Sequence, residues 1–385
     1  MTQSLARIMA GIPATNMALY HQVRFLAGDP AALLVIHDGT RLVRTLMLRD
    51  IEMERAANQA RVDAVCCPAD YAPPSGLSGD RETATAQAAA EFFRRHGVRS
   101  VTADRSLPLI YHEMLRRADI EVACDLQWGI IERRAKDEQE VEWLREAQAA
   151  TECVMERACR CVARAEARAE GALFTDGEPL TSERLQRMID VWLLEEGYHN
   201  PGSIVAGGPQ GADCHHLGSG PLFSGQPVII DIFPRNRRTL YHGDCTRTVV
   251  HGDIPPAVAA MHQAVVEAKR AATAIVRSGV TGEDVHRAAI GVIESNGYGV
   301  GLPGPSDDDA YCAMVHGTGH GIGLDVHEPP LLDLGGPELV AGDALTIEPG
   351  LYCRAIGGVR VEDMVIVTVD GSIRLNRLPE GLDWS

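Results

Sequence analysis

The segment from His316 to Pro330 constrains this chain most, because it combines three histidines with four glycines. The histidines stand at positions 316, 320 and 327, and the glycines at 317, 319, 321 and 323. Histidines four residues apart can bind zinc from one face of a helix. Each glycine inside a helix costs about 1 kcal/mol, however, so an extended segment is predicted, with backbone and imidazoles close to a bound group. A phosphate loop would need a lysine and a following helix, which are absent here.

Four acidic residues lie in apolar, strand-like surroundings, where an unpaired carboxylate is costly. Asp231 follows residues 228–230, and Glu348 follows residues 344–347. Asp244 and Glu362 lie in similar stretches. A single buried acid is usually explained by an ion pair, but four of them together with a glycine-flanked histidine favour a metal site.

Four carboxylates and one imidazole form an oxygen-rich ligand set. Such a set suits two divalent ions, Mn²⁺, Co²⁺, Fe²⁺ or Zn²⁺, better than it suits a structural zinc. Two bridging carboxylates can hold two ions about 3.5–4 Å apart, with a shared water or hydroxide as the nucleophile.

These motifs resemble those of the pita-bread metallopeptidases, which include Xaa-Pro aminopeptidases, prolidases and methionine aminopeptidases, with creatinase as a metal-free relative. The resemblance covers about residue 137 to the C-terminus by motif, and the preceding region by general layout. The matching positions are Asp231, Asp244-x-Thr246-Arg247-Thr248, His316-x-x-x-His320-Gly321, His327-Glu328, Glu348-Pro349-Gly350 and Gly358-Val359-Arg360-x-Glu362-Asp363.

The resemblance implies a role for each metal ligand. Asp231 would bind one metal through both oxygens, Asp244 and Glu362 would bridge, and His320 and Glu348 would bind the second metal. Glu348 would also accept the proton of the bridging water. The expected ions are two Mn²⁺, with Co²⁺, Fe²⁺ or Zn²⁺ as alternatives.

The resemblance also implies roles for residues around the metals. His327 would steady the tetrahedral intermediate and His316 would line the substrate cleft. His215 best matches an upstream substrate histidine, although the adjacent His216 could replace it. Arg360 matches a family arginine near the site, or it forms an ion pair that orients Asp244 or Glu362. Most other histidines, such as His286, are expected at the surface or at helix caps.

The chain is expected to form two domains. Residues 1–133 alternate short strand-like runs with helical patterns, which predicts an α/β domain with a mainly parallel sheet. A domain of this creatinase-like kind shapes the cleft and holds a homodimer together in the resembled family. Residues 137–385 would form the catalytic domain, beginning with a long helix that Asp137 and Glu140 can cap.

An internal repeat is visible in this second domain. Two predicted helices precede Asp231 and Asp244, and two more precede Glu348 and Glu362. The acids recur after 117 residues (231 to 348) and 118 residues (244 to 362). Two like units around a pseudo-two-fold axis agree with the α+β pita-bread fold that the resemblance implies.

The connection between the first two acids departs from the family pattern. The family has about ten residues there, whereas this chain has 13 positions from Asp231 to Asp244. The longer turn adds Arg235, Arg237 and Arg238, which could form a local basic patch. Both ligands are expected to survive, and one rim of the cleft is expected to differ.

The composition limits the classes of partner and the cellular compartment that are expected. A formal net charge of −17 argues against nucleic acid and anionic membranes as partners. The sequence has no apolar run of 18 residues, and its N-terminal segment lacks the apolar region of a signal peptide. The ten cysteines form no Cys-x-x-Cys pair, so reduced thiols in a cytoplasmic protein are expected.

The leading functional hypothesis is a dimetal hydrolase that cleaves the Xaa-Pro bond in dipeptides or at the N-terminus of short peptides. Its proline preference comes from the resemblance alone. The N-terminal domain favours an Xaa-Pro aminopeptidase or dipeptidase over a methionine aminopeptidase. The alternative is a small-molecule hydrolase or lyase on the same fold, similar to ectoine hydrolase or a sulfonium lyase. A non-catalytic binding protein would usually have lost ligands.

Overall fold

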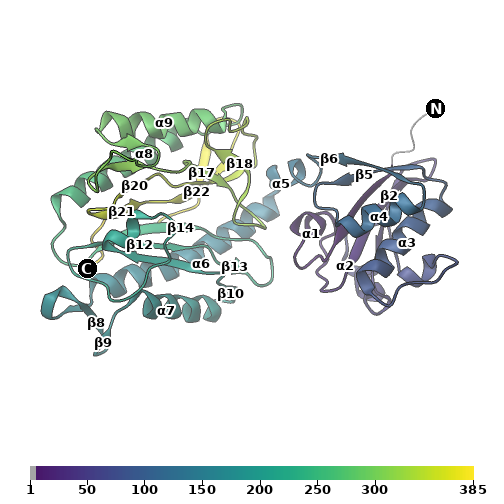
Figure 1. Cartoon of the computed structure of the whole chain (residues 1–385), viewed down its shortest axis with the longest axis horizontal. Helices are drawn as coiled ribbons and strands as arrows, with labels where there is room; N and C mark the ends of the chain where they lie inside the picture. Colours follow the sequence, from purple (N-terminus) through teal and green to yellow (C-terminus); the bar gives the residue numbers. More distant parts are fainter. Residues whose placement is uncertain (1–5) are drawn as a thin grey trace. The chain divides into compact units, whose positions relative to one another are not determined.

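The computed structural model describes residues 6–385, and the chain divides into two compact units, Met1–Arg133 and Arg134–Ser385. Residues 1–5, part of the segment considered for a signal peptide, lie outside the described residues. Figure 1 labels many of the elements of both units. Among residues 6–385, no helix combines the length and the apolar character needed to cross a bilayer.

The first unit is built on one six-stranded sheet with the order β4-β3-β2-β1-β5-β6 within the described residues. Its strands are β1 (Arg7–Gly11), β2 (Ala31–His37), β3 (Leu42–Met47), β4 (Ala64–Cys66), β5 (Ser100–Asp104) and β6 (Glu121–Asp125). The helices are α1 (Met17–Val23), α2 (Met53–Gln59), α3 (Arg81–Arg95), α4 (Leu109–Arg117) and α5 (Ile131–Arg134).

This sheet is mixed, with more parallel than antiparallel pairings among its described strands. Three of its described pairings are parallel (β3 with β4, β1 with β5, β5 with β6), while β1–β2 and β2–β3 are antiparallel. The tight turn after His37 forces the antiparallel β2–β3 pair, because parallel strands need a long crossover connection.

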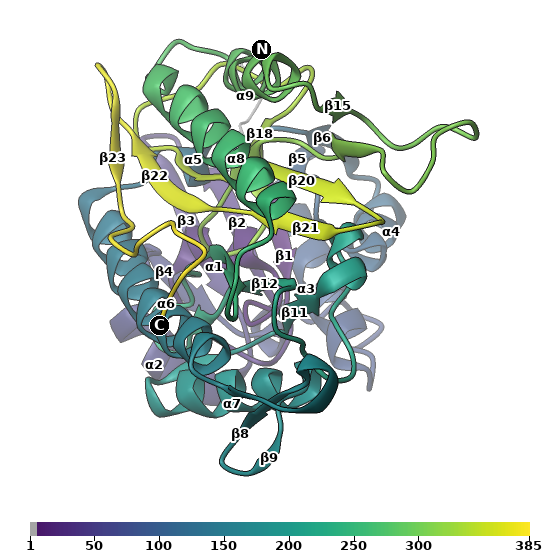
Figure 2. The same ribbon diagram turned by 90° about the vertical axis from the view of Figure 1, so that its left-hand side faces the viewer.

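The second unit contains four long helices and several short sheets. Helix α6 (Glu138–Ala163) begins at the predicted capping box, in which Asp137 and Glu140 bond each other's backbone N–H groups. The others are α7 (Ser182–Glu195), α8 (Pro256–Ile275) and α9 (Gly282–Ser295). In Figures 1 and 2, α8 and α9 lie on one side of the strands, and α6 and α7 on the other.

The strands between these helix pairs form three main sheets. The first is β11 (Ser203–Gly207), β12 (Pro227–Ile232) and β14 (Cys245–Val250). The second is β15 (Gly299–Val300), β16 (Cys312–Met314), β20 (Gly350–Cys353) and β21 (Gly357–Arg360). The third is β18 (Glu328–Leu332), β17 (Gly319–Gly321), β19 (Ala344–Ile347), β22 (Asp363–Val367) and β23 (Ser372–Arg374). Short strands β7 (Glu166–Ala167), β8 (Leu173–Thr175) and β9 (Glu178–Pro179) pair together, as do β10 (Tyr198–His199) and β13 (Arg235–Asn236).

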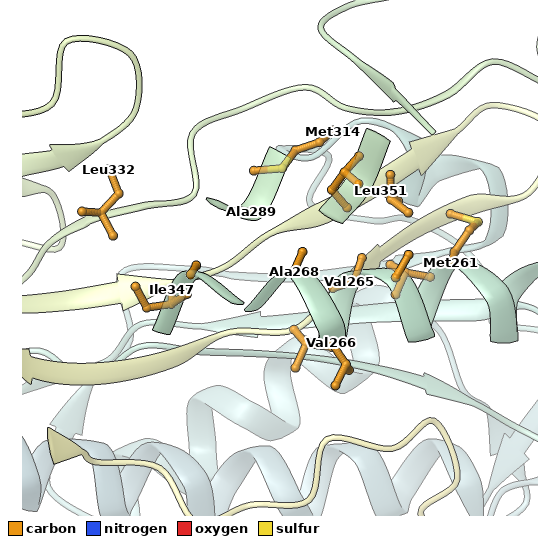
Figure 3. Close-up of a cluster of buried hydrophobic side chains, with 14 of the residues drawn as sticks. Met261, Val265, Val266, Ala268, Ala289, Met314, Leu332, Ile347 and Leu351 are labelled. Atoms are coloured by element: carbon orange, nitrogen blue, oxygen red, sulfur yellow. The ribbon is translucent and has the colours of Figure 1, made fainter. Parts of the chain in front are cut away.

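Each helix pair has its own apolar core. Buried side chains of α8 and α9, such as Val265 and Ala289, pack with Met314, Ile347 and Leu351 from the strands (Figure 3). A separate core joins α6 and α7 to β12 and β14. The α+β class and the internal repeat thus appear as two like halves, whose inner strands carry the predicted acids.

Candidate metal centre

The predicted ligands stand where strands of the two halves meet. Asp231 lies inside β12, opposite Thr246 of β14, and Asp244 immediately precedes β14. Glu348 follows β19, while Glu362 lies between β21 and β22. His320 is the central residue of β17. Strand ends are suitable places for ligands, because the apolar residues before them are fixed in the core.

These side chains converge on a small volume. Ligand atoms of Asp244, His320 and Glu362 lie within 4.8 Å of one another. Nε2 of His320 lies 3.4 Å from Oε1 of Glu348 and 3.9 Å from Oδ2 of Asp244. Asp231 lines the same pocket. The structure therefore brings all five predicted ligands into one site.

The glycines around His320 allow this convergence. A Cβ atom at Gly319 would lie 2.0 Å from the carbonyl oxygen of Thr346, and one at Gly321 would lie 2.5 Å from that of Pro329. Only glycine permits so close an approach of backbones. The segment is extended, as predicted, and it carries its histidine between β18 and β19.

Burial and mutual repulsion control the protonation of the acids. Burial raises the pKa of Asp244 well above its usual value, and the nearby Glu362 and Asp231 raise it further. The pKa of Glu362 is raised in the same way, first by burial and then by the nearby Glu348 and Asp231. Burial also raises the pKa of Glu348. A cation would remove this repulsion.

The imidazole of His320 is arranged to present a lone pair. Its pKa is lowered by burial, which favours the neutral ring. Nδ1 lies 3.1 Å from the carbonyl oxygen of Gly321 and donates its proton there. Nε2 is then the unprotonated nitrogen and faces the carboxylates, as expected of a metal-binding histidine.

The donor set contains a buried oxygen atom that no other described group satisfies. Oδ1 of Asp231 is buried and has no hydrogen-bond partner among residues 6–385. A buried oxygen in this state is costly unless a ligand satisfies it. The set also contains three carboxyl groups with raised pKa values and a neutral imidazole. These donors together fit divalent cations that prefer oxygen and nitrogen ligands.

All the other predicted site residues line the same cavity, which has a volume of about 640 Å³. Of the two candidate histidines in the upstream loop, His215 lines it, while Nδ1 of His216 accepts the backbone N–H of Gly218. The rings of His215 and His327 have no hydrogen-bond partner in the described part of the chain and are free to meet a substrate. The ring of His327 stands edge-on to that of His320, with centroids 4.4 Å apart.

His316 lines the cavity but is already engaged on both sides. Its Nδ1 lies 2.7 Å from the carbonyl oxygen of Gly317, and its Nε2 lies 2.7 Å from the hydroxyl of Tyr352. Tyr352 in turn accepts a hydrogen bond from Nη1 of Arg360 at 2.9 Å. His316 therefore shapes the wall of the cavity through its ring rather than through a free nitrogen.

Arg360 forms an ion pair, but not with the carboxylates expected. Its Nη2 lies 2.7 Å from Oδ2 of Asp231, and its Nε lies 3.9 Å from Oε2 of Glu348. The expectation that Arg360 orients Asp244 or Glu362 directly is wrong. Its Nε instead donates to the hydroxyl of Thr246, at 3.2 Å, because β21 lies beside β14 at this point.

Two residues that support the ligands were not anticipated. Gln148 of α6 bonds both backbone groups of Asp244: its Oε1 accepts the N–H at 2.9 Å and its Nε2 donates to the carbonyl at 2.8 Å. The hydroxyl of Thr246 donates to Oε2 of Glu362 at 2.9 Å. Thr246 was part of the motif, whereas nothing in the local sequence distinguishes Gln148 from a surface glutamine.

His286 and Lys136 support the site residues without lining the cavity themselves. His286 was expected at the surface or at a cap, which is wrong: it is only 4% exposed. Its Nδ1 lies 3.0 Å from the hydroxyl of Thr318, so it supports the segment that leads to His320. Lys136 forms a buried ion pair with Glu328, and Glu328 also accepts the backbone N–H of Leu324 at 2.8 Å. This pair supports the loop that carries His327.

The lengthened turn adds further residues to the cavity. Phe233, Arg235 and His242 line it, and none of them was predicted as a site residue. Burial lowers the pKa of His242 to about 4, and its Nδ1 lies 3.1 Å from the carbonyl oxygen of Phe233. The rim of the cleft formed by residues 233–243 is thus a defined part of the site.

Known proteins resemble this chain in sequence or in fold. A "Probable dipeptidase PepE" of Mycobacterium tuberculosis is 34% identical over 72% of this chain, which spans 64% of the length of that protein. The Xaa-Pro dipeptidase of Pyrococcus horikoshii is 28% identical over 74% of this chain and 76% of its own length. An Xaa-Pro dipeptidase structure from Bacillus anthracis superposes with a TM-score of 0.79 at 20% identity, covering 98% of this chain and 94% of its own. The pita-bread fold is thereby confirmed. Residues 142–369 match the model of metallopeptidase family M24, and this chain belongs to that family.

Proposed function

We propose that this chain is a peptidase dependent on two divalent metal ions, which hydrolyses the Xaa-Pro bond of dipeptides or of short peptides. The observation that carries the proposal is the convergence of four carboxylates and one neutral imidazole in a cavity with free histidines. The similarity to the Xaa-Pro dipeptidase of Pyrococcus horikoshii supports the choice of substrate.

The metal ligands would be Asp231, Asp244, His320, Glu348 and Glu362, with Mn²⁺ the first choice and Co²⁺, Fe²⁺ or Zn²⁺ as alternatives. Asp244 and Glu362 would help to hold the ions, since each carboxyl lies close to other acids of the set. Bound cations would supply an electrophile for the peptide carbonyl and an activated water as the nucleophile.

The protein groups around the metals have separate tasks. The carboxyl of Glu348 has a raised pKa and lies beside His320, so it can accept a proton and later release it to the leaving nitrogen. Burial lowers the pKa of His327, and its neutral ring can donate a hydrogen bond to the developing oxyanion. His215 faces the cavity with a free ring and can bind the substrate.

We also propose a homodimer that acts on small substrates in the cytoplasm. The dimer rests on the family resemblance. The net charge of −17 supports the exclusion of nucleic acid and anionic membranes, and the ten free cysteines support a reducing compartment. Light scattering of the purified protein tests the dimer.

The function is tested by chelating the purified protein, reloading it with Mn²⁺ or Co²⁺, and assaying Ala-Pro against Ala-Ala. We expect about two ions per chain, loss of activity on chelation, recovery on reloading, and a preference for Ala-Pro. Full activity without metal would refute the metal-dependent mechanism. Metal loading without any peptide hydrolysis would instead favour the small-molecule hydrolase or lyase on this fold.

A further inference from the structure

The turn between β12 and β14 is longer than the family pattern and has its own structure. Within this turn, the backbone of Arg235 pairs with that of His199 in β10 and forms an isolated antiparallel β-bridge with that of His242. The side chain of Asn236 fixes the tip, because its Oδ1 accepts the backbone N–H groups of Arg238 at 2.9 Å and Thr239 at 3.0 Å. The position of Arg235 is therefore set by the backbone on both sides.

Arg235 brings a positive charge into the cavity. It is half-buried and lines the same space as Asp231, His320 and His327. Arg360 is the other arginine among the described lining residues, and it is committed to Asp231 and Tyr352. The guanidinium of Arg235 has no ion pair and no hydrogen bond within residues 6–385. A guanidinium in this state is suited to a carboxylate, which it can bind through two parallel hydrogen bonds.

Arg235 lies within range of a short substrate in this cavity. It follows the metal ligand Asp231 by four residues, so the backbones of the two residues lie at most about 14 Å apart. The scissile carbonyl and the terminal carboxylate of an Xaa-Pro dipeptide are separated by the proline alone, a span of about 3.5 Å. A dipeptide whose scissile carbonyl lies at the metal ligands would therefore hold its terminal carboxylate in the same cavity as Arg235.

We propose that Arg235 is the specificity-determining residue that binds the C-terminal carboxylate of an Xaa-Pro dipeptide. This role of Arg235 rests on the proposed function and makes it more specific: the enzyme is a dipeptidase rather than an aminopeptidase that acts on longer chains. Binding a free carboxylate at this distance from the metals selects substrates of two residues, because a third residue would replace the charge with a neutral amide.

The test compares Ala-Pro with Ala-Pro-amide on the metal-loaded protein. The two differ only in the charge at the C-terminus. We expect kcat/KM of the wild type to favour the free acid by about 10- to 100-fold, the usual effect of hydrogen bonds between charged groups. In Arg235→Gln the ratio should fall close to one, mainly through a higher KM for Ala-Pro, and Arg235→Lys should retain part of the preference.

Arg237→Gln is the matched control, because Arg237 is exposed, belongs to the same turn and loses the same charge without lining the cavity. Its acid-to-amide ratio should equal that of the wild type. An unchanged ratio in Arg235→Gln, or an equal loss in Arg237→Gln, overturns the role of Arg235 while leaving the peptidase intact. No hydrolysis of either substrate by the metal-loaded wild type refutes the proposed function itself, and the role of Arg235 with it.

Discussion

Thr246 illustrates how a side chain that is not a predicted ligand can control one that is. Its hydroxyl donates to Glu362 and accepts from Arg360, and both partners are buried. Removing the hydroxyl would leave the second oxygen of Glu362 without this bond. Groups that orient metal ligands in this way typically affect metal affinity by 10- to 100-fold.

Thr246→Val is therefore expected to weaken metal binding by about 10- to 100-fold while keeping the volume of the side chain. Titration of the metal-free protein with Mn²⁺ measures the effect. Thr248→Val is the control, since the Thr248 hydroxyl bonds only the backbone of Arg360, at 3.0 Å on each side. An equal loss of affinity in both variants would contradict the role of Thr246.

Two histidines of the same segment should behave differently. His320→Ala should lower metal content and activity together, because Nε2 of His320 faces the carboxylates. His327→Ala should retain the metals and slow turnover by about 10²–10³, as for one oxyanion donor. Metal analysis and kcat of both variants distinguish these outcomes. If His327→Ala loses its metals and His320→Ala keeps them, the assignment of the segment is inverted.

For single residues, the sequence predicts membership of the site where the neighbours along the chain determine the surroundings of the side chain. Asp231 and Glu348 follow apolar strands, and His320 stands between glycines, so their place in a site follows from neighbours along the chain. Gln148 and His286 contact residues 96 and 32 positions away. No neighbouring residue in the sequence indicates those contacts, because they form only when each helix packs against the strands of its own half.

Strands β14 and β22 have site residues on one side and a buried ion cluster, which supports them, on the other. Thr246 and Thr248 of β14 point to the same side, toward Glu362 and the backbone of Arg360, and Arg247 between them points the other way, as the alternation of a strand requires. Arg247 and Lys269 of α8 pair there with Asp363, which directly follows the ligand Glu362. The buried ion cluster therefore fixes the start of β22 from behind.

Asp363→Asn should destabilise the protein by about 3–5 kcal/mol, because Arg247 and Lys269 would stay buried without that carboxylate. Denaturant unfolding of the metal-free protein measures the change. Asp309→Asn is the control: Asp309 is 78% exposed and faces Arg354 at 4.0 Å, so its loss should cost less than about 1 kcal/mol. Equal effects would show that the buried cluster does not stabilise the fold.

The element boundaries were predictable where caps or glycines mark them. Helix α6 begins at the predicted capping box, and α9 ends at Ser295, shortly before Gly297. The first sheet was harder, since β1 is a short strand at the centre of the sheet whose partners lie up to about a hundred residues away. The path of residues 233–243 depends on pairing with β10, which a turn sequence alone does not specify.

The whole catalytic unit is a pair of like halves joined at their carboxylates. Each half contributes two acids, and burial holds the pKa of Asp244 and Glu362 above the usual range. Without metal, the folded protein retains protons that the unfolded chain releases above about pH 4. The stability due to these groups is thus present at low pH and is lost as pH rises toward their folded pKa values.

Metal binding should accordingly stabilise the protein more as pH rises. The ligands must be deprotonated, so binding releases protons and its affinity increases with pH. We expect the rise in Tm on adding Mn²⁺ to grow between about pH 5 and pH 8. Calorimetry of chelated and reloaded protein tests this, with the chelated sample as reference at each pH. A shift independent of pH would contradict the raised pKa values.

The repeat has a consequence for how such a site can arise. Neither half holds enough ligands alone, because the first supplies Asp231 and Asp244 and the second supplies His320, Glu348 and Glu362. A half-length ancestor could complete the centre only by meeting a second copy, at a rate set by its concentration. Fusing the two copies in one gene makes that encounter intramolecular, and the centre then forms at any dilution while each half is free to diverge.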